Sequence, residues 1–305
     1  MPTNFPEAWE SRVRNNLTTA DVAPWTEGIA ELDTAVIEVG SGDASESNII
    51  HVPTSTFEPD VLINNTTYPL AVQAYTDSDV TLQLDKYQTK VTTISDDQAI
   101  GASYNRIDNA TRSHTVSITK KKYAKAIHAA APASNTANTP VIQTTGALVN
   151  GRRRLVYDDL VSLKSKFDTM EVPEEGRRLV LSSDHWNDLL LDRNNFGNLL
   201  IDYVKGKPAP MIAGFELYQY IANPWYTTGG TVKLAFAAAP GGSDFRASVA
   251  FYAPNMVKKT GMTKQYFANS KQDPENQTNR IAYRHYFIFL PTQNKYIGAI
   301  ASATS

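Results

Sequence analysis

The chain has 305 residues, of which 42% are hydrophobic and 10% aromatic, a composition typical of a folded protein with one large or two ordinary domains. Its 29 basic and 31 acidic residues leave a net charge of −2, which excludes a global basic field, so direct contact with nucleic acid would need a local patch. Cysteine is absent, which excludes disulfides, thiolate nucleophiles and cysteine-bound zinc.

The N-terminal sequence MPTNFPEAWESRVRNNL has no apolar core of a signal peptide, and no stretch approaches the ~18 apolar residues of a membrane span. We therefore expect synthesis in a cytoplasm and no contact with a membrane. Residues 5–17 are spaced like a short amphipathic helix, with Trp9, Val13 and Leu17 on one side. A peripheral arm and a frayed terminus both fit this segment.

Residues 48–94 are rich in β-branched and aromatic residues, interrupted by prolines and a TDSD turn. Few of these segments have a thick apolar face, although they continue for nearly fifty residues. An extended β segment with little core of its own is usually stabilised by a partner chain or by edge pairing. An ordinary antiparallel sheet is the alternative. We predict strands within 48–57, 60–75 and 80–94.

A capping sequence at 95–98 predicts a short helix, and the stretch RSHTVSITKKKYAKAIHAAAP that follows predicts a longer one that ends at Pro132. Four lysines lie near its middle and end, and they fit either a solvated face that complements the helix dipole or a contact with a partner or nucleic acid. The predicted buried face consists of Val116, Thr119, Tyr123, Ala126 and Ala130, and the lysines largely off this face are Lys120, Lys121, Lys122 and Lys125.

Residues 155–192 have the clearest pattern in the chain, that of helix, turn, strand and helix. Val172-Pro173 ends the first helix, 179–181 is a short apolar strand, and Ser183 can cap the second helix. The apolar face of the first helix comprises Val156, Leu160, Leu163, Phe167 and Met170, and the second helix is expected to bury Trp186, Leu189 and Leu190.

Three apolar runs in the last third of the chain each end in proline, as strands that leave into turns do: 231–240, 247–254 and 284–291. Residues 261–283 are polar and predict a long connection or a hairpin tip. Because strands, helices and strands follow one another in blocks rather than alternating, the fold class is predicted to be α+β.

No constellation of residues indicates an active site. The five histidines have no metal-binding spacing, and the motifs of zinc proteases, nucleophile elbows, P-loops and dinucleotide sites are absent. Asp184-His185 and Arg284-His285 are the only pairs that merit consideration as site residues. We predict no catalytic residue, no cofactor and no metal ligand.

The order of these segments resembles that of the major capsid protein of tailed bacteriophages, with the Hong Kong 97-type fold. The most specific stretch is VPEEGRRLVLSSDHWNDLL after a helix, followed by IAGFELYQYIANP, where the family's chain returns to its sheet. Ser183 stands where proline is commoner in the family. The resemblance covers about residues 5–300 and depends on pattern rather than on an invariant motif.

The resemblance implies an icosahedral shell of pentamers and hexamers that encloses double-stranded DNA, in the virion. Its partners would be other copies of the chain, with scaffold, portal and decoration proteins and weak, non-specific contact with packaged DNA. The implied parts are an N-terminal arm (1–41), an extended β-loop (42–95), a peripheral domain (96–204, with a spine helix at about 105–131, a second helix at about 157–171 and strands returning at about 276–305) and a mainly axial domain (205–275). The predicted subunit contacts are Phe5, Trp9, Phe57, Leu62, Tyr68, Arg152, Arg153 and Arg154.

Three other interpretations stay open from the sequence. A cellular, encapsulin-like shell of the same fold would have much the same sequence pattern. A small-molecule enzyme would use His185 or His285 and would contain a pocket. A β-rich binding module would expose a ligand face on a folded monomer.

Overall fold

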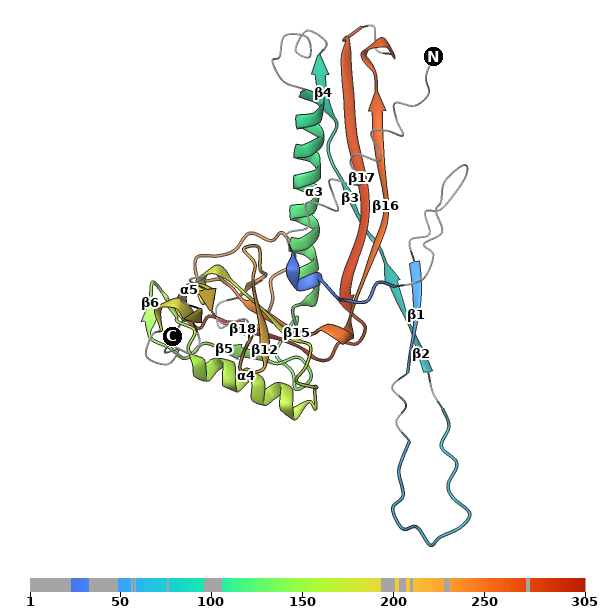
Figure 1. Ribbon diagram of the computed structural model, residues 1–305, viewed down its shortest axis with the longest axis vertical. Helices are drawn as coiled ribbons and strands as arrows, with labels where there is room; N and C mark the ends of the chain where they lie inside the picture. The colour runs from blue at the N-terminus through green and yellow to red at the C-terminus, as the bar shows by residue number, and fades with distance from the viewer. Residues whose placement is uncertain are drawn as a thin grey trace.

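The computed structural model describes residues 23–32, 49–55, 57, 59–75, 77–95, 106–192, 201–202, 207–208, 211–227, 231–272 and 275–304. The expected helix at 5–17, the contact residues Phe5 and Trp9, and most of the short helix expected after residue 95 lie outside these ranges. The chain forms an elongated half, a compact half and a projecting two-stranded ribbon (Figure 1).

The elongated half consists of one long helix lying against an antiparallel sheet (Figure 1). Strand β17 (Thr278–Pro291) pairs along its length with β16 (Met256–Ala268), and its other edge pairs with β3 (Asp85–Gln88) and β4 (Thr92–Ser95). Helix α3 (Arg106–Ala130) confirms the long helix predicted to end at Pro132, and its bounds are close to the 105–131 expected for a spine helix. The segment predicted as a polar connection, 261–283, is instead mostly strand, because pairing with a long neighbour satisfies its backbone without a continuous apolar face.

The predicted buried face of α3 is confirmed at four positions and wrong at Val116, which is exposed. Lys122, expected off this face, is only 5% exposed and lies over the rings of Tyr123 and Phe287. The aromatic rings attract its ammonium group, which a reading by hydrophobicity cannot anticipate.

The compact half is built on a mixed six-stranded sheet in the order β11-β12-β8-β15-β18-β5. Its strands are β5 (Val141–Gln143), β8 (Arg177–Leu181), β11 (Met211–Ile212), β12 (Phe215–Gln219), β15 (Ser248–Tyr252) and β18 (Ile297–Ala301). Short pairs complete it: β6 (Leu148–Val149) with β7 (Arg152–Arg153), β9 (Ile201–Asp202) with β10 (Lys207–Pro208), and β13 (Trp225–Tyr226) with β14 (Phe245–Arg246). Single 3-10 turns occur at Pro24–Thr26, Ala253–Asn255 and Ser270–Gln272.

Two helices pack beside this sheet. Helix α4 (Tyr157–Thr169) confirms the predicted second helix and buries Leu160, Leu163 and Phe167. Helix α5 (Ser183–Leu191) begins one residue earlier than expected, because the Ser182 hydroxyl, not that of Ser183, accepts the capping hydrogen bond from the His185 amide (3.4 Å).

Trp25 joins the two halves. Its fully buried ring meets Tyr123 of α3, Phe251 of β15, Phe289 of β17 and Tyr220 edge-on, at centroid distances of 5.3 to 6.3 Å. The backbone around it is fixed by Arg178, which donates to the carbonyls of Trp25 (2.9 Å) and Glu27 (2.6 Å). Residues 23–32, which the family resemblance assigns to an arm, therefore form part of the subunit's own core.

The predicted boundary between residues 204 and 205 does not follow the sheets. Strand β8, from the range predicted as peripheral, pairs with β12 and β15 from the range predicted as axial, and β16 pairs with β17 in the elongated half. Pairing between strands distant in the sequence sets the real division, and local pattern does not reveal it. The strand predicted at 231–240 is also absent: this described segment has only isolated bridges at Val232 and Lys233.

Candidate functional site

The projecting ribbon is the most unusual feature of the surface. Strands β1 (Ile49–Ser55) and β2 (Asp77–Gln83) pair antiparallel in register, and the loop 59–75 extends from them, away from both halves of the molecule (Figure 1). Leu82, at the base of β2, is buried with Leu84, Val257 and Tyr286, which anchors the ribbon to the elongated sheet. The loop itself has no strand, contrary to the prediction for 60–75.

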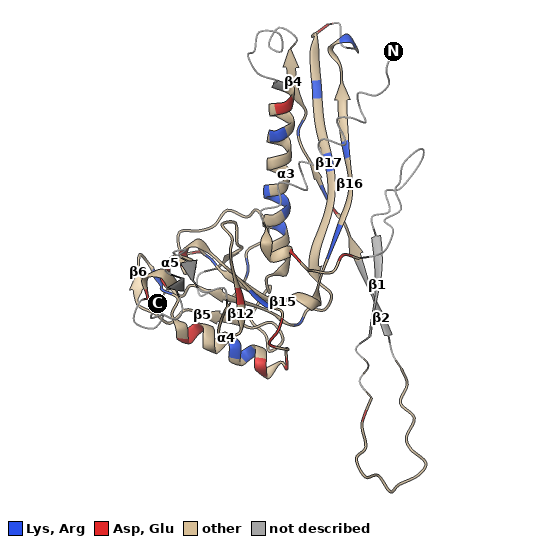
Figure 2. Cartoon of the chain, in the orientation of Figure 1, with Lys and Arg blue, Asp and Glu red and all other residues tan. Residues whose placement is uncertain are grey.

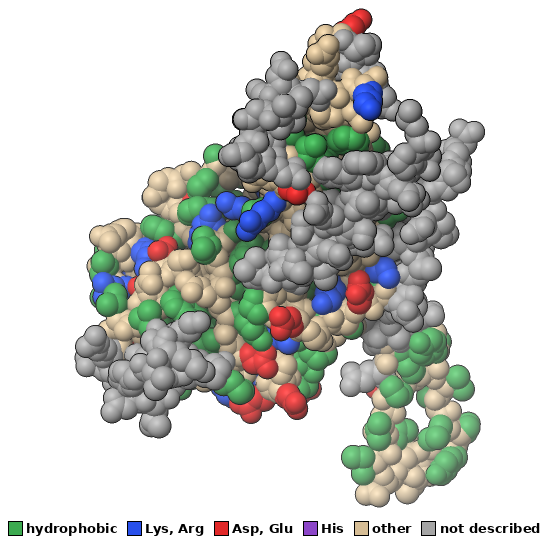
Figure 3. All heavy atoms as spheres, turned by 45° about the horizontal axis from the view of Figure 1, so that its top comes forward, with side chains coloured by type: hydrophobic (Ala, Val, Ile, Leu, Met, Phe, Trp, Pro, Cys, Tyr) green, Lys and Arg blue, Asp and Glu red, His purple; other side chains and the backbone are tan. Residues whose placement is uncertain are grey.

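Apolar side chains cover the projecting loop. Val72 is 96% exposed and Ile63 is 84% exposed, and apolar atoms surround the loop in the space-filling view (Figure 3). The other large exposed apolar residues of the loop are Val61, Leu62, Tyr68, Leu70 and Tyr75. A concentration of this kind marks a surface that another molecule covers, because burying each such side chain is worth about 1.5–3 kcal/mol.

Few internal contacts hold the loop in its shape. Asp60 and Gln73 hydrogen bond across it through the Asp60 amide (3.0 Å) and the Gln73 side-chain amide. Near its tip, Asn65 forms a small turn with Thr67, donating to the Thr67 carbonyl at 2.7 Å. These polar links set the course of the backbone but bury none of the apolar side chains, so the loop does not provide its own core.

Three predicted contact residues lie in this region. Leu62 and Tyr68 are exposed on the loop, whereas Phe57 is half-buried and packs edge-on against Tyr75 at 5.3 Å. Leu62 and Tyr68 are therefore available to a partner, and Phe57 supports the base of the loop.

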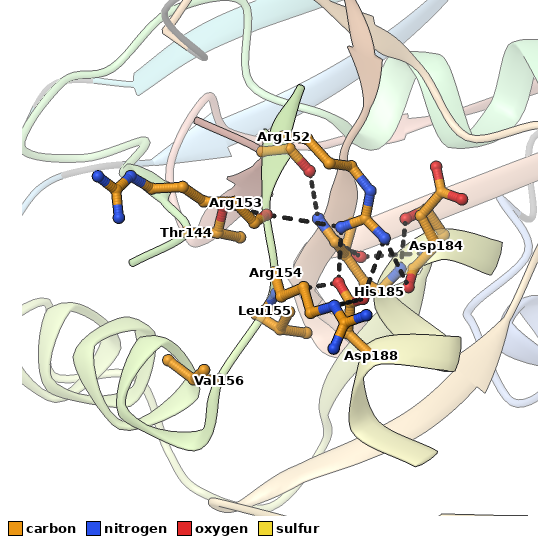
Figure 4. A network of polar contacts seen from close by, with 12 residues as sticks. Thr144, Arg152, Arg153, Arg154, Leu155, Val156, Asp184, His185 and Asp188 are labelled. Carbon is orange, nitrogen blue, oxygen red and sulfur yellow. Dashed lines mark hydrogen bonds and ion pairs between the residues drawn. The ribbon is translucent and has the colours of Figure 1, made fainter. Parts of the chain in front are cut away.

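The three consecutive arginines Arg152, Arg153 and Arg154 lie away from the loop, in β7 and the residue after it. Their side chains bind partners within the subunit (Figure 4). Arg152 makes two charge-assisted hydrogen bonds to Asp188 of α5, at 2.6 and 3.0 Å, and Arg154 forms a looser ion pair with the same carboxylate at 3.9 Å. Arg153 donates to the Gly146 carbonyl at 3.2 Å. Asp188 also accepts from the Leu155 amide at 3.0 Å, so the triplet mainly joins β7 to α5.

His185 lies next to this network and is fully buried. Its ring is hydrogen bonded to Ser248 at 2.7 Å through Nδ1 and to Ser302 at 3.0 Å through Nε2. Burial, with the nearby charge of Arg152, lowers the pKa of His185 to about 4, so the ring is neutral at pH 7. It connects α5, β15 and the chain after β18 as a structural group.

His285 on β17 is similarly enclosed. It is 1% exposed, its Nδ1 is hydrogen bonded to the Thr263 hydroxyl at 2.9 Å, and burial together with the charge of Lys122 lowers its pKa to about 3. A catalytic base must reach a substrate proton, and neither buried ring offers that access. Among the described residues, no group of His, Asp and Glu side chains could hold a metal, and no helix is long and apolar enough to cross a membrane.

Comparison with known proteins places this geometry in context. The sequence model of a family described as "Phage capsid protein" matches residues 76–302, more than half of the chain. No curated protein matches the sequence. The structure is similar to the capsid of cyanophage P-SCSP1u (TM-score 0.61, 14% identity, covering 90% of this chain and 93% of that one). It is also similar to the capsid of a native GTA particle (TM-score 0.61, 10% identity, 93% and 99%) and to the mature capsid of bacteriophage PhiM1 (TM-score 0.57, 11% identity, 89% and 92%). These likenesses show an α+β fold of the Hong Kong 97 type.

Proposed function

This chain belongs to the phage capsid protein family, and from that premise we propose that it assembles into pentamers and hexamers of an icosahedral shell that encloses double-stranded DNA. Capsid proteins are structural components of the virion that associate with copies of themselves. The family match also favours a phage capsid over an encapsulin-like cellular shell.

The observation that carries the proposal is the projecting apolar loop. Its exposed side chains, from Val61 to Tyr75, have no covering surface within the described part of the subunit. Because the ribbon points away from the body, the surface that covers it belongs to a neighbouring copy (Figure 1). A contact between two different patches on identical subunits is heterologous, and such contacts form rings where the rotation between neighbouring copies closes.

We assign the parts of the subunit by their sheets rather than by sequence ranges. The elongated half, with α3, β3, β4, β16 and β17, is proposed as the peripheral part, and the ribbon as the extended loop that lies on a neighbour. The compact half, with α4, α5 and the six-stranded sheet, is proposed as the axial part near the symmetry axes. Leu62 and Tyr68 are proposed as subunit contacts, and Phe57 as their support.

The role that we propose is non-enzymatic. It agrees with the enclosed positions of His185 and His285, which leave a substrate no access to either ring. Scaffold, portal and decoration proteins are proposed as further partners, and synthesis is proposed to occur in the host cytoplasm.

Electron microscopy in negative stain, combined with sedimentation of the purified full-length chain, tests the proposal. Closed shells, rings or tubes are expected, with a matching fast-sedimenting fraction. A chain that stays monomeric at micromolar concentration, both alone and when co-expressed with the neighbouring phage genes, contradicts it.

A further inference from the structure

A groove runs between α3 and a wall made by β3, the start of β4 and the residues that link them. One wall is the exposed side of the helix, including Ser113, Ser117 and Lys121, and the other includes Lys86, Lys90 and Thr92. Its remaining lining residues supply rings, small groups and further polar side chains, but no carboxylate. The groove is therefore cationic, with several hydroxyl groups along its length.

The exposed residues of α3 recur at intervals of three and four, and one of them, Lys121, lines the groove together with Lys86 and Lys90 of the other wall. Arg112 and Lys120 are exposed on the neighbouring part of the helix surface, outside the groove lining. Figure 2 shows basic residues at one position in the upper part of α3 and on several turns in its lower part, with uncharged turns between them. Arg112, Lys90, Lys120 and Lys121 form no ion pair with any described residue, whereas Lys125, on the adjacent side of the helix, pairs with Asp85.

We propose that this groove binds the phosphate backbone of the enclosed DNA, an inference that depends on the proposed function and gives the genome contact a location. Ser113, Ser117 and Lys121 follow one line along the helix and span about 12 Å. That length matches the axial rise of about three to four nucleotides on one DNA strand.

The side chains of the groove favour a polyanion that is bound through its own phosphate backbone. Lysine ammonium and serine hydroxyl groups are typical phosphate contacts, and they carry no sequence information. A small cationic groove on a chain of net charge −2 gives weak, salt-sensitive binding, which lets a shell hold its genome without trapping it. An acidic surface of another copy is the competing partner, and the experiment below distinguishes the two.

The test measures how binding of the unassembled full-length chain to a short random-sequence DNA duplex depends on salt. The double variant Lys90→Gln/Lys121→Gln removes two groove cations. Lys166→Gln/Lys271→Gln is the matched control, because it removes two exposed lysines outside the groove. Fluorescence anisotropy gives the affinity, and circular dichroism checks that both variants fold.

The slope of log K against log salt is negative, and loss of two phosphate contacts should make it less steep by about 1.8 and weaken binding more than about tenfold near 0.1 M salt. The control should keep the slope of the unaltered chain. In the opposite direction, Ser117→Lys adds a cation at the middle of the groove and should steepen the slope by about 0.9.

Equal slopes for the unaltered chain and all three variants would overturn the proposal. Unchanged DNA affinity combined with loss of shells in the groove variant would overturn it too, and would identify another copy as the partner. If the unaltered chain binds DNA with this slope pattern but forms no shell, the groove is supported and the assembly proposal fails instead.

Discussion

At the scale of residues, Asp188 connects separate segments of the compact half. Asp188 is 3% exposed, and its carboxylate accepts two hydrogen bonds from Arg152 and one from the Leu155 amide. From the sequence, Arg152, Arg153 and Arg154 were predicted as subunit contacts, and Asp188 was not singled out. An aspartate in a helix normally faces water. Its partner Arg152 is more than thirty residues away in the sequence, and only the packing of β7 against α5 brings the two together.

Replacing Asp188 by alanine should be strongly destabilising. The change leaves the Arg152 guanidinium without its partner in a mostly buried position, and removing one member of such a pair costs about 3–5 kcal/mol. Lys164→Gln is the control, because its ion pair with Asp168 is solvent-exposed and worth about 1 kcal/mol or less. Urea unfolding followed by circular dichroism measures both, and equal losses in the two variants would contradict the assigned role of Asp188.

His185 predicts a dependence of stability on pH. Burial lowers its pKa in the folded chain to about 4, against an ordinary value of 6.5, with Arg152 also disfavouring and Asp188 favouring the charged ring. Between these values the unfolded chain binds more protons, so the contribution of His185 to stability is complete above pH 6.5 and is lost as the pH falls toward 4. The loss approaches about 3 kcal/mol.

Urea titrations between pH 7.5 and 4.5 test this dependence. Other groups titrate in the same range, so the decisive quantity is the difference between the unaltered chain and His185→Gln. The variant should be less stable at pH 7.5 and should lose less stability on acidification. Parallel pH profiles would show that His185 does not titrate as described.

At the scale of elements, Trp25 is the largest buried side chain of residues 23–32 and their main apolar contact with the rest of the subunit. Trp25 contacts both halves, and its neighbours Tyr123, Phe251 and Phe289 come from three different elements. Trp25→Ala should therefore cost about 3–5 kcal/mol, the usual effect of removing a buried tryptophan. Tyr266→Ala, at an exposed aromatic, is the control. A change in the urea midpoint no larger than that of the control would contradict this central position.

The elements that the sequence predicted well are those whose apolar spacing is decisive. Helix α4 has a clear apolar face, and Pro173 follows four residues after its last residue, Thr169. Both of its boundaries agree with the prediction to within two residues. The alanine-rich run 231–240 misled the prediction because small apolar residues also tolerate exposure, and most of this segment is exposed. Strand β16 was missed because its polar residues pair within a sheet that alternation alone does not reveal.

At the scale of the whole molecule, the ribbon separates folding from assembly. Two hydrophobic clusters stabilise the compact half and its junction with α3, and neither contains a residue of the loop. The exposed apolar residues of the loop are therefore available only to another molecule. From the sequence, residues 48–94 were predicted to have little core of their own and to need a partner chain or edge pairing. The sequence could not place the strands at the two ends, because the pairing of Ser55 with Asp77 bridges more than twenty intervening residues.

Trimming the loop should therefore abolish assembly and preserve the fold. The variant replaces residues 56–76 with Asn-Gly, which suits a two-residue hairpin between the paired residues Ser55 and Asp77. Because Leu82 and the rest of the ribbon base remain, circular dichroism and the urea midpoint should change little, while sedimentation and electron microscopy should detect no shells.

A second variant keeps the loop and changes only its chemistry. Ile63→Ser/Val72→Ser removes two of its most exposed apolar side chains, and Val161→Ser on α4 is a control with an exposed apolar residue outside the ribbon. Each buried side chain lost at an interface removes about 1.5–3 kcal/mol per contact, and a shell multiplies that loss over its many copies. Shell formation should therefore need a markedly higher protein concentration in the loop variant than in the control. If the trimmed chain unfolds, or if both loop variants assemble normally, the ribbon belongs to the subunit's own fold and the contact between copies lies elsewhere.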